Sequence, residues 1–183
     1  MPSTAATAAP VAALLDARDT SALPTLLLAI LTVDTVTLAI ARYFPGFLGA
    51  TLNEWYDRFG LSAVLADVFI IFIGFLLARY IYTRLQYREL PAFLGILVLV
   101  QLLHDLLFYA AVIEPLPTGH NAMIDVFQRY AKAGPIILVG DAVLMLASAF
   151  VALVYLRQPS HVVWSAGALI AYALPYLLYT QWK

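Results

Sequence analysis

The sequence predicts an all-α integral membrane protein with five transmembrane helices. Of its 183 residues, 63% are hydrophobic and only 11% are charged, whereas charged residues make up about a quarter of a typical soluble domain. Mostly apolar stretches of roughly 20 residues are long enough to cross a bilayer as helices. The chain holds five such stretches within one predicted transmembrane domain, residues 23–183, at about Leu23–Tyr43, Gly60–Arg84, Pro91–Ile113, Pro135–Leu156 and His161–Thr180.

The first four predicted spans belong to a two-helix hairpin pattern that occurs twice. Asp34 lies in the first span, and an aromatic-Arg-aromatic segment, Trp55–Phe59, begins 21 positions after it. Asp105 lies in the third span, and the segment Val126–Tyr130 begins at the same offset. This spacing predicts a duplicated hairpin.

Each of these segments leads through a glycine into another apolar run that carries one aspartate. Asp67 lies seven positions after Gly60, and Asp141 lies seven positions after Gly134. Because two spans separate equivalent positions, both copies should have the same orientation, related by a pseudo-twofold axis along the membrane normal. The predicted layout is a mobile N-terminal tail at 1–22, repeat 1 at about 23–84, repeat 2 at about 91–156 and an extra helix at about 160–180.

The connections between the spans predict how the chain is placed in the membrane. The two aromatic segments fall in long connections, and we expect short helices that lie on the same membrane surface with their aromatic side down. The ten basic residues divide five against five between the two sides. Arg84, Arg88 and Arg157 lie in short loops near span ends, which favours a cytoplasmic N-terminus by the positive-inside rule.

Four aspartates are the candidate ion- or proton-binding residues. With a rise of ~1.5 Å per residue, Asp67 and Asp141 lie roughly 10 Å below the face that carries the long connections. Asp34 and Asp105 should lie at a similar or slightly greater depth. An unpaired carboxylate at a helix centre costs about 2.5–3.5 kcal/mol, so protons, a shared cation or hydrogen bonds must offset the cost. Intramembrane acids of this kind are typical of ion and proton pathways.

The third span adds two polar residues to the candidate site. Gln101 and Asp105 are four positions apart and share a helix face, whereas His104 and Asp105 diverge by about 100° and are not expected to form a pair. His104 suits a hydrogen-bonded interior histidine, a single axial ligand to haem or chlorophyll, or a divalent-metal site shared with the carboxylates. No span carries a recognisable metal-binding motif, so the metal and the cofactor stay open.

Three further charged residues are candidates for gating or charge pairing. Arg58 and Arg129 recur in the two aromatic segments, and we expect them to cap the nearby aspartates, or the partners of these aspartates, as ion pairs. Glu114 follows the third span in a loop with two prolines and a glycine, where it is a candidate for lining an entrance. An ordinary structured turn is the alternative for this loop.

These features favour a cation- or proton-coupled carrier or channel-like protein over an enzyme. One alternative is a non-catalytic membrane scaffold or assembly subunit, in which the acids and arginines only lock helices together. Another is a metal-dependent membrane enzyme that uses His104 and Asp105. A net charge of −1 gives no argument for nucleic acid. The expected partners are the lipid bilayer and, through helix 160–180, a second copy of the chain or another subunit of a membrane complex.

Overall fold

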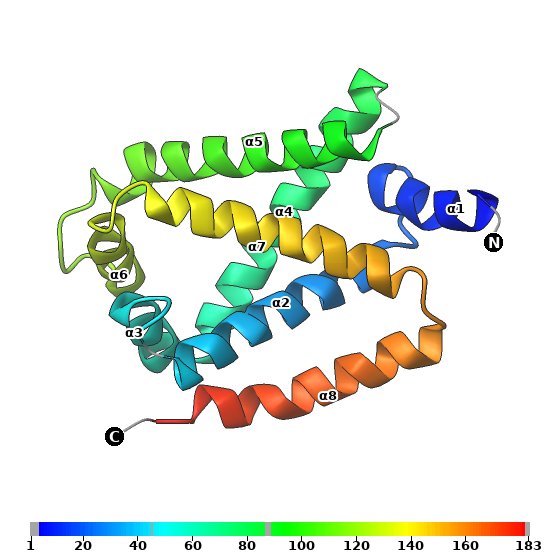
Figure 1. The fold of residues 1–183 in the computed structure, drawn as a ribbon. Coiled ribbons are helices and arrows are strands. Elements are labelled where there is room, and N and C mark those ends of the chain that lie inside the picture. Colours follow the sequence, from blue (N-terminus) through cyan, green and yellow to red (C-terminus); the bar gives the residue numbers. More distant parts are fainter. Residues whose placement is uncertain (1–3, 45, 87–88, 182–183) are drawn as a thin grey trace.

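A computed structural model of the chain describes residues 4–44, 46–86 and 89–181, and all regular structure in these ranges is helical (Figure 1). The elements are α1 (Thr4–Leu15), α2 (Leu23–Tyr43), α3 (Ala50–Phe59), α4 (Leu61–Leu85), α5 (Leu90–Phe108), the π-helical segment η1 (Tyr109–Ile113), α6 (Ala122–Ala131), α7 (Ile136–Tyr155) and α8 (Ser160–Leu178).

Five helices, namely α2, α4, α5 with η1, α7 and α8, are long and apolar enough to cross a membrane. The prediction of an all-α chain with five such helices is therefore confirmed. Pro24 and Pro91 lie in the first turns of α2 and α5, where their missing N–H groups leave no helical hydrogen bond unmade. Gly60, with φ 52°, provides the left-handed backbone at which α3 ends and α4 begins.

Four of the five long helices form a bundle. Helix α2 packs against α4 and α7, and α5 packs against the same two helices. Phe75, Phe93, Leu97 and Met145 are fully buried inside the bundle. Met145 uses the space that Gly74 leaves open, since a Cβ atom at Gly74 would lie 2.9 Å from the Met145 methyl carbon. Helix α8 packs on the outside of α2, at the edge of the bundle (Figure 1).

The two aromatic segments form α3 and α6, which lie side by side at one end of the bundle (Figure 1). Each helix has ten residues and buries one face: Trp55 and Tyr56 are buried in α3, and Ile124 and Val126 in α6. Both segments are therefore short helices at the same end, as expected, and they cover the ends of the long helices.

The N-terminal segment differs from the expected mobile tail. It forms α1, which contacts α4, α5 and α7 at the end of the bundle away from α3 and α6 (Figure 1). Leu14 is fully buried. The buried Arg79 of α4 donates hydrogen bonds through Nη2 to three backbone carbonyl oxygens within residues 13–19. Because a buried guanidinium needs acceptors, this arginine docks the turn that follows α1 against the bundle.

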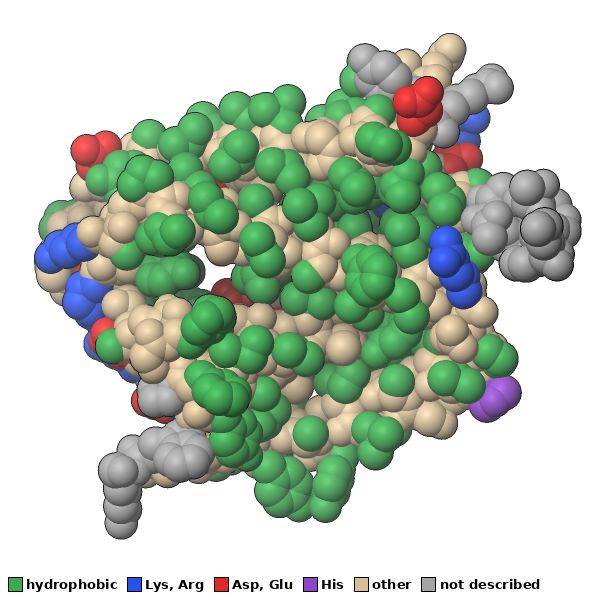
Figure 2. Space-filling view, in the orientation of Figure 1, with side chains coloured by type: hydrophobic (Ala, Val, Ile, Leu, Met, Phe, Trp, Pro, Cys, Tyr) green, Lys and Arg blue, Asp and Glu red, His purple; other side chains and the backbone are tan. Residues whose placement is uncertain are grey.

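Apolar side chains cover the outer faces of the long helices. Phe69, Leu107, Phe150 and Leu169 are large and well exposed examples. Figure 2 shows hydrophobic side chains along the helices and charged side chains gathered near the two ends of the bundle. A surface of this kind fits the hydrocarbon core of a bilayer, as expected of an integral, multi-pass membrane protein.

Candidate functional site

Asp34 lies in the middle of α2 with its side chain buried. Its Oδ1 atom accepts a hydrogen bond of 3.0 Å from the hydroxyl group of Tyr56 in α3. The other oxygen, Oδ2, is buried and has no hydrogen-bond partner among the residues that the structure describes. A neutral hydroxyl group therefore holds this carboxyl group in place without neutralising its charge.

Asp67 on α4 binds the neighbouring aromatic residue of α3. The indole Nε1 of Trp55 donates a hydrogen bond of 2.9 Å to Asp67 Oδ2. This contact is possible because the chain turns at Gly60 from α3 into α4, which brings residue 55 next to residue 67. The Trp55 ring also packs against Phe127 of α6, with ring centroids 4.8 Å apart. Two adjacent residues of α3 thus bind carboxyl groups on two different long helices.

Tyr56 lies between the first two aspartates. Burial raises the pKa of its phenol well above the ordinary value, and the charges of Asp34 and Asp67 raise it further. Both carboxyl groups are therefore close to one hydroxyl group in a poorly solvated site.

Tyr130 of α6 occupies the corresponding place for the other aspartates. The pKa of Tyr130 is raised to about 12, and burial is the largest cause. The charges of Asp141, Asp67 and Asp105 contribute to this value, so all three carboxyl groups lie within interaction range of one phenol. The structure thus gathers the four predicted aspartates around two tyrosines that come from α3 and α6. We refer to Asp34, Asp67, Asp105 and Asp141 as the aspartate cluster.

The polar residues of α5, Gln101, His104 and Asp105, agree with the prediction except for one contact. Gln101 Nε2 donates a hydrogen bond of 2.7 Å to Asp105 Oδ1, in agreement with their shared helix face. His104 was not expected to pair with Asp105, and this was wrong, since its Nδ1 atom lies 3.1 Å from the same Oδ1. The 100° separation applies at Cβ, whereas the longer imidazole can reach back around the helix. His104 is 37% exposed and stacks on Phe108, with ring centroids 5.7 Å apart.

The expected partners of two arginines also need correction. Arg129 does not cap an aspartate of the cluster; it forms a two-point ion pair with Glu54 of α3. Arg58 also faces Glu54, with a closest N–O distance of 3.6 Å. Arg129 reaches Glu54 because α6 lies beside α3, whereas Arg58 lies one helical turn from Glu54 within α3. At the surface, both side chains avoid the cost of burying a guanidinium.

Arg42 is a buried arginine that the sequence reasoning did not include. It forms an ion pair of 2.6 Å with Asp57 and donates hydrogen bonds of 3.2 Å to Asn53 and to the carbonyl oxygen of Leu178. These contacts fix α2 to α3 and to the end of α8. In the described part of the chain, no member of the aspartate cluster forms an ion pair with arginine or lysine.

Figure 2 shows a hollow in the face below α7 and next to α6, with acidic atoms visible inside it. Within the described residues, no group of three or more His, Asp and Glu side chains is arranged to hold a metal ion. The cluster is therefore a set of carboxyl groups with hydrogen-bond donors around it, and it differs in form from a chelating metal site.

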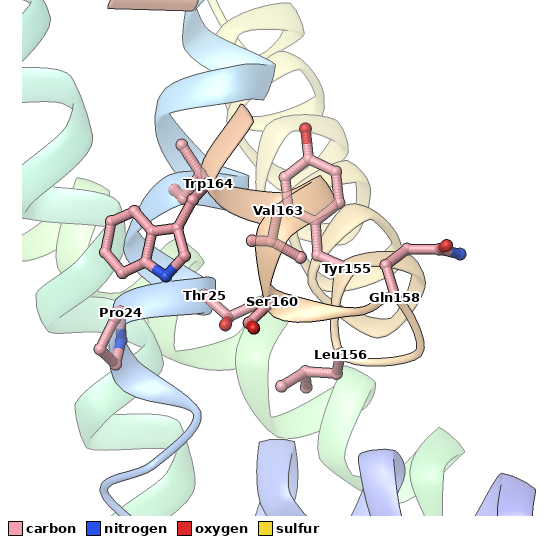
Figure 3. A pocket seen from close by; sticks show the side chains of 9 residues that line it. Pro24, Thr25, Tyr155, Leu156, Gln158, Ser160, Val163 and Trp164 are labelled. Atoms are coloured by element: carbon pink, nitrogen blue, oxygen red, sulfur yellow. The ribbon is translucent and has the colours of Figure 1, made fainter. Parts of the chain in front are cut away.

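Two hollows lie outside the aspartate cluster. Glu114, the predicted entrance residue, is exposed and lines an open hollow of about 490 Å³ next to α6. The other hollow, of about 160 Å³, lies between the starts of α2 and α8 and the end of α7 (Figure 3). Its polar lining residues are Thr25, Tyr155, Gln158, Ser160 and Trp164, and no charged side chain lines it.

Comparison with known proteins finds no protein-family model, curated sequence or solved structure that matches this chain. The residues that the sequence prediction missed at the site are three aromatic side chains, two of which donate hydrogen bonds to the aspartates. Trp55, Tyr56 and Tyr130 lie in the two segments that were expected to face the membrane, and their indole and phenol groups were the available signal.

Proposed function

We propose that this protein is a small carrier or channel-like membrane protein that takes up a proton or a cation at the aspartate cluster. The supporting observation is the kind of donor that the cluster uses. Trp55, Tyr56 and Gln101 donate hydrogen bonds to its carboxyl groups, and these three donors are uncharged. The fourth partner, His104 beside Asp105, is charged only when it is protonated. The three uncharged donors orient the carboxyl groups but leave the negative charge available to a proton or cation.

The energetics favour uptake over permanent charge. Each unpaired carboxylate deep in a bilayer costs about 2.5–3.5 kcal/mol. Arginine or lysine partners would offset that cost, but Arg129 and Arg42 pair with Glu54 and Asp57 instead. A mobile proton or cation offsets the same cost while it is bound. A proton or a singly charged cation fits better than a divalent metal ion, because the described residues offer no three-ligand group.

We also propose that the two halves of the bundle are copies of one hairpin. Helices α2 and α5 each pack against both α4 and α7, while α3 packs against α6. Exchanging α2 with α5, α3 with α6 and α4 with α7 leaves these neighbours unchanged, as a twofold axis requires, although α3 packs more closely on α2 and α4 than α6 does on α5 and α7. An experimental structure tests this, since residues 34–82 should superpose on residues 105–155 by a rotation near 180° about the membrane normal. Unrelated packing angles in the two halves would rule out the duplication.

Flux measurements on reconstituted protein test the transport proposal. Wild-type protein in vesicles should carry protons or a singly charged cation down an imposed gradient. Asp105→Asn keeps the side-chain volume but removes the titratable charge, so flux should fall at least tenfold while the protein stays folded. Glu89→Gln, at an exposed position before α5, is the matched control and should leave flux unchanged. Wild-type protein without any pH- or cation-dependent flux would contradict the proposal.

A scaffold or assembly subunit is the second candidate function, and α8 supplies the observation that favours it. Its outer face exposes Trp164, Tyr172 and Tyr176, each by more than half of its surface. Aromatic residues of this kind are enriched where protein subunits meet. Under this alternative, a charged substitution at Tyr172 should dissociate an assembly in mild detergent. Wild-type protein should show no pH- or cation-dependent flux, and Asp105→Asn should only lower stability.

A further inference from the structure

The hollow beside Glu114 has walls that the fold holds in place. Helix α5 ends in the π-helical segment η1, closed by a hydrogen bond of 2.9 Å from the Glu114 N–H to the Tyr109 carbonyl oxygen. Gln128 of α6 donates to the carbonyl oxygens of Ile113 and Leu116 at 2.9 and 2.8 Å. One side chain therefore ties the turn after η1 to α6. π-helical turns inside membrane-spanning and other helices occur frequently at functional sites.

Two opposite charges line this hollow. Glu114 comes from the end of η1, and Lys132 comes from the end of α6. Both side chains are exposed, and neither forms an ion pair with any residue in the described ranges. The hollow therefore presents one carboxylate and one ammonium group that the protein does not pair with each other.

The remaining walls and the size of the hollow suit a small molecule. Tyr109, Ile113 and Leu116 contribute apolar surface, and Thr118 and Gln128 add polar groups. The volume of about 490 Å³ falls within the range of about 300–1,000 Å³ that is common for small-molecule sites. The hollow lies where a long apolar helix ends, beside α6, which is the level at which lipid headgroups meet a membrane protein.

We infer that this hollow binds a zwitterion, with a primary ammonium group at Glu114 and a phosphate or carboxylate group at Lys132. A simple cation would leave Lys132 without a partner, and a simple anion would leave Glu114 without one. A zwitterion pairs with both, and charge-assisted hydrogen bonds to both groups are stronger than neutral ones. The headgroup of an aminophospholipid and a free soluble zwitterion share this chemistry. The site does not include the aspartate cluster and does not rest on the proposed transport function.

Lipid titration of the full-length protein tests the site, with native mass spectrometry in detergent as the readout. Phosphatidylethanolamine should bind roughly tenfold more tightly than phosphatidylcholine with the same acyl chains, because a quaternary ammonium group cannot donate a hydrogen bond to Glu114. Glu114→Gln and Lys132→Gln should each weaken phosphatidylethanolamine binding by about tenfold. Glu89→Gln and Arg157→Gln remove exposed charges elsewhere and are the matched controls.

A charge exchange makes the test specific. The double variant Glu114→Lys with Lys132→Glu keeps one charge of each sign in the hollow, so it should recover most of the affinity that either single variant loses. Competition by soluble phosphoethanolamine would show that the headgroup alone is recognised. The site would then accept a free soluble zwitterion in addition to the lipid. Binding of the lipid without such competition would assign it to a membrane lipid. Equal binding of the two phospholipids by wild-type protein, or full binding by both single variants, would overturn the inference.

Discussion

Trp55 and Asp67 lie twelve positions apart on either side of a left-handed glycine, and a hydrogen bond of 2.9 Å joins the indole nitrogen to the carboxyl group. The bond links α3 to α4, and it gives a carboxyl group of the aspartate cluster an uncharged donor. It also suggests a direct test of whether α3 holds the cluster together.

Trp55→Phe should destabilise the protein by about 1–3 kcal/mol, since it removes the indole donor from a carboxyl group in a poorly solvated site. Phenylalanine keeps an aromatic ring against Phe127, so the loss reports mainly on the hydrogen bond. Unfolding in detergent by heat or denaturant measures the change. Trp164→Phe, on the exposed face of α8, should change stability by no more than about 0.5 kcal/mol. Equal effects of the two substitutions would argue against the role of the bond.

Tyr130 should be among the last tyrosines to ionise. Its pKa in the folded protein is raised to about 12, whereas a tyrosine in an unfolded chain ionises at about pH 10. Below about pH 10 the folded and the unfolded chain both hold this proton, so Tyr130 does not make the stability of the fold depend on pH in that range. Between about pH 10 and 12 the unfolded chain loses the proton first, and the stability of the fold decreases as pH rises.

Tyrosinate absorbance follows this titration directly. The wild-type curve should contain a component near pH 12 that disappears in Tyr130→Phe. Phenylalanine should also reduce the loss of stability between about pH 10 and 12. A wild-type curve that is complete near pH 10 would show that Tyr130 is not buried beside the aspartates.

The ion pair between Arg129 and Glu54 should contribute about 0.5–1 kcal/mol of coupling between α3 and α6, because both side chains are partly exposed. A double-mutant cycle with Arg129→Gln and Glu54→Gln measures it, and added salt should weaken it. Arg58→Gln is the control, since Arg58 reaches Glu54 only at 3.6 Å within α3. A coupling for Arg58 as large as that for Arg129 would contradict the pairing described above.

Arg79→Met should cost at least about 2 kcal/mol, because the buried guanidinium donates to three carbonyl oxygens at once. The segment after α1 should then separate from the bundle and exchange its amide hydrogens faster. Hydrogen exchange followed by mass spectrometry over residues 12–20 measures this effect. Arg84→Met removes an exposed arginine from the same helix and should leave exchange in that segment unchanged.

The long helices were predictable because a bilayer demands about 20 apolar residues for each crossing. The position of the aspartates was also predictable in outline. Asp34 and Asp67 bind adjacent residues of α3, in line with the similar depths that helix rise predicts from their sequence spacing. The hydrogen bond between Gln101 and Asp105 followed from their spacing of four residues on one helix face.

The partners of the charged residues were not predictable in the same way. Arg129 meets Glu54 because of how two surface helices lie against each other, and spacing along the chain does not determine that arrangement. His104 reaches Asp105 through the length and rotation of its side chain, which a helix projection does not represent. The sequence carries residue types and intervals, whereas these contacts depend on packing angles between separate helices.

The docking of α1 has an evolutionary consequence. Arg79 binds the segment through backbone carbonyl oxygens, and every amino acid, including proline, carries such an oxygen. Substitutions at positions 13, 16 and 19 can therefore accumulate without removing an acceptor, provided that the backbone path is kept. Among descendants of a common ancestor, selection would act on the arginine and on the path of the turn, which Asp16 and Asp19 also support through side-chain hydrogen bonds, while position 13 would be free to drift.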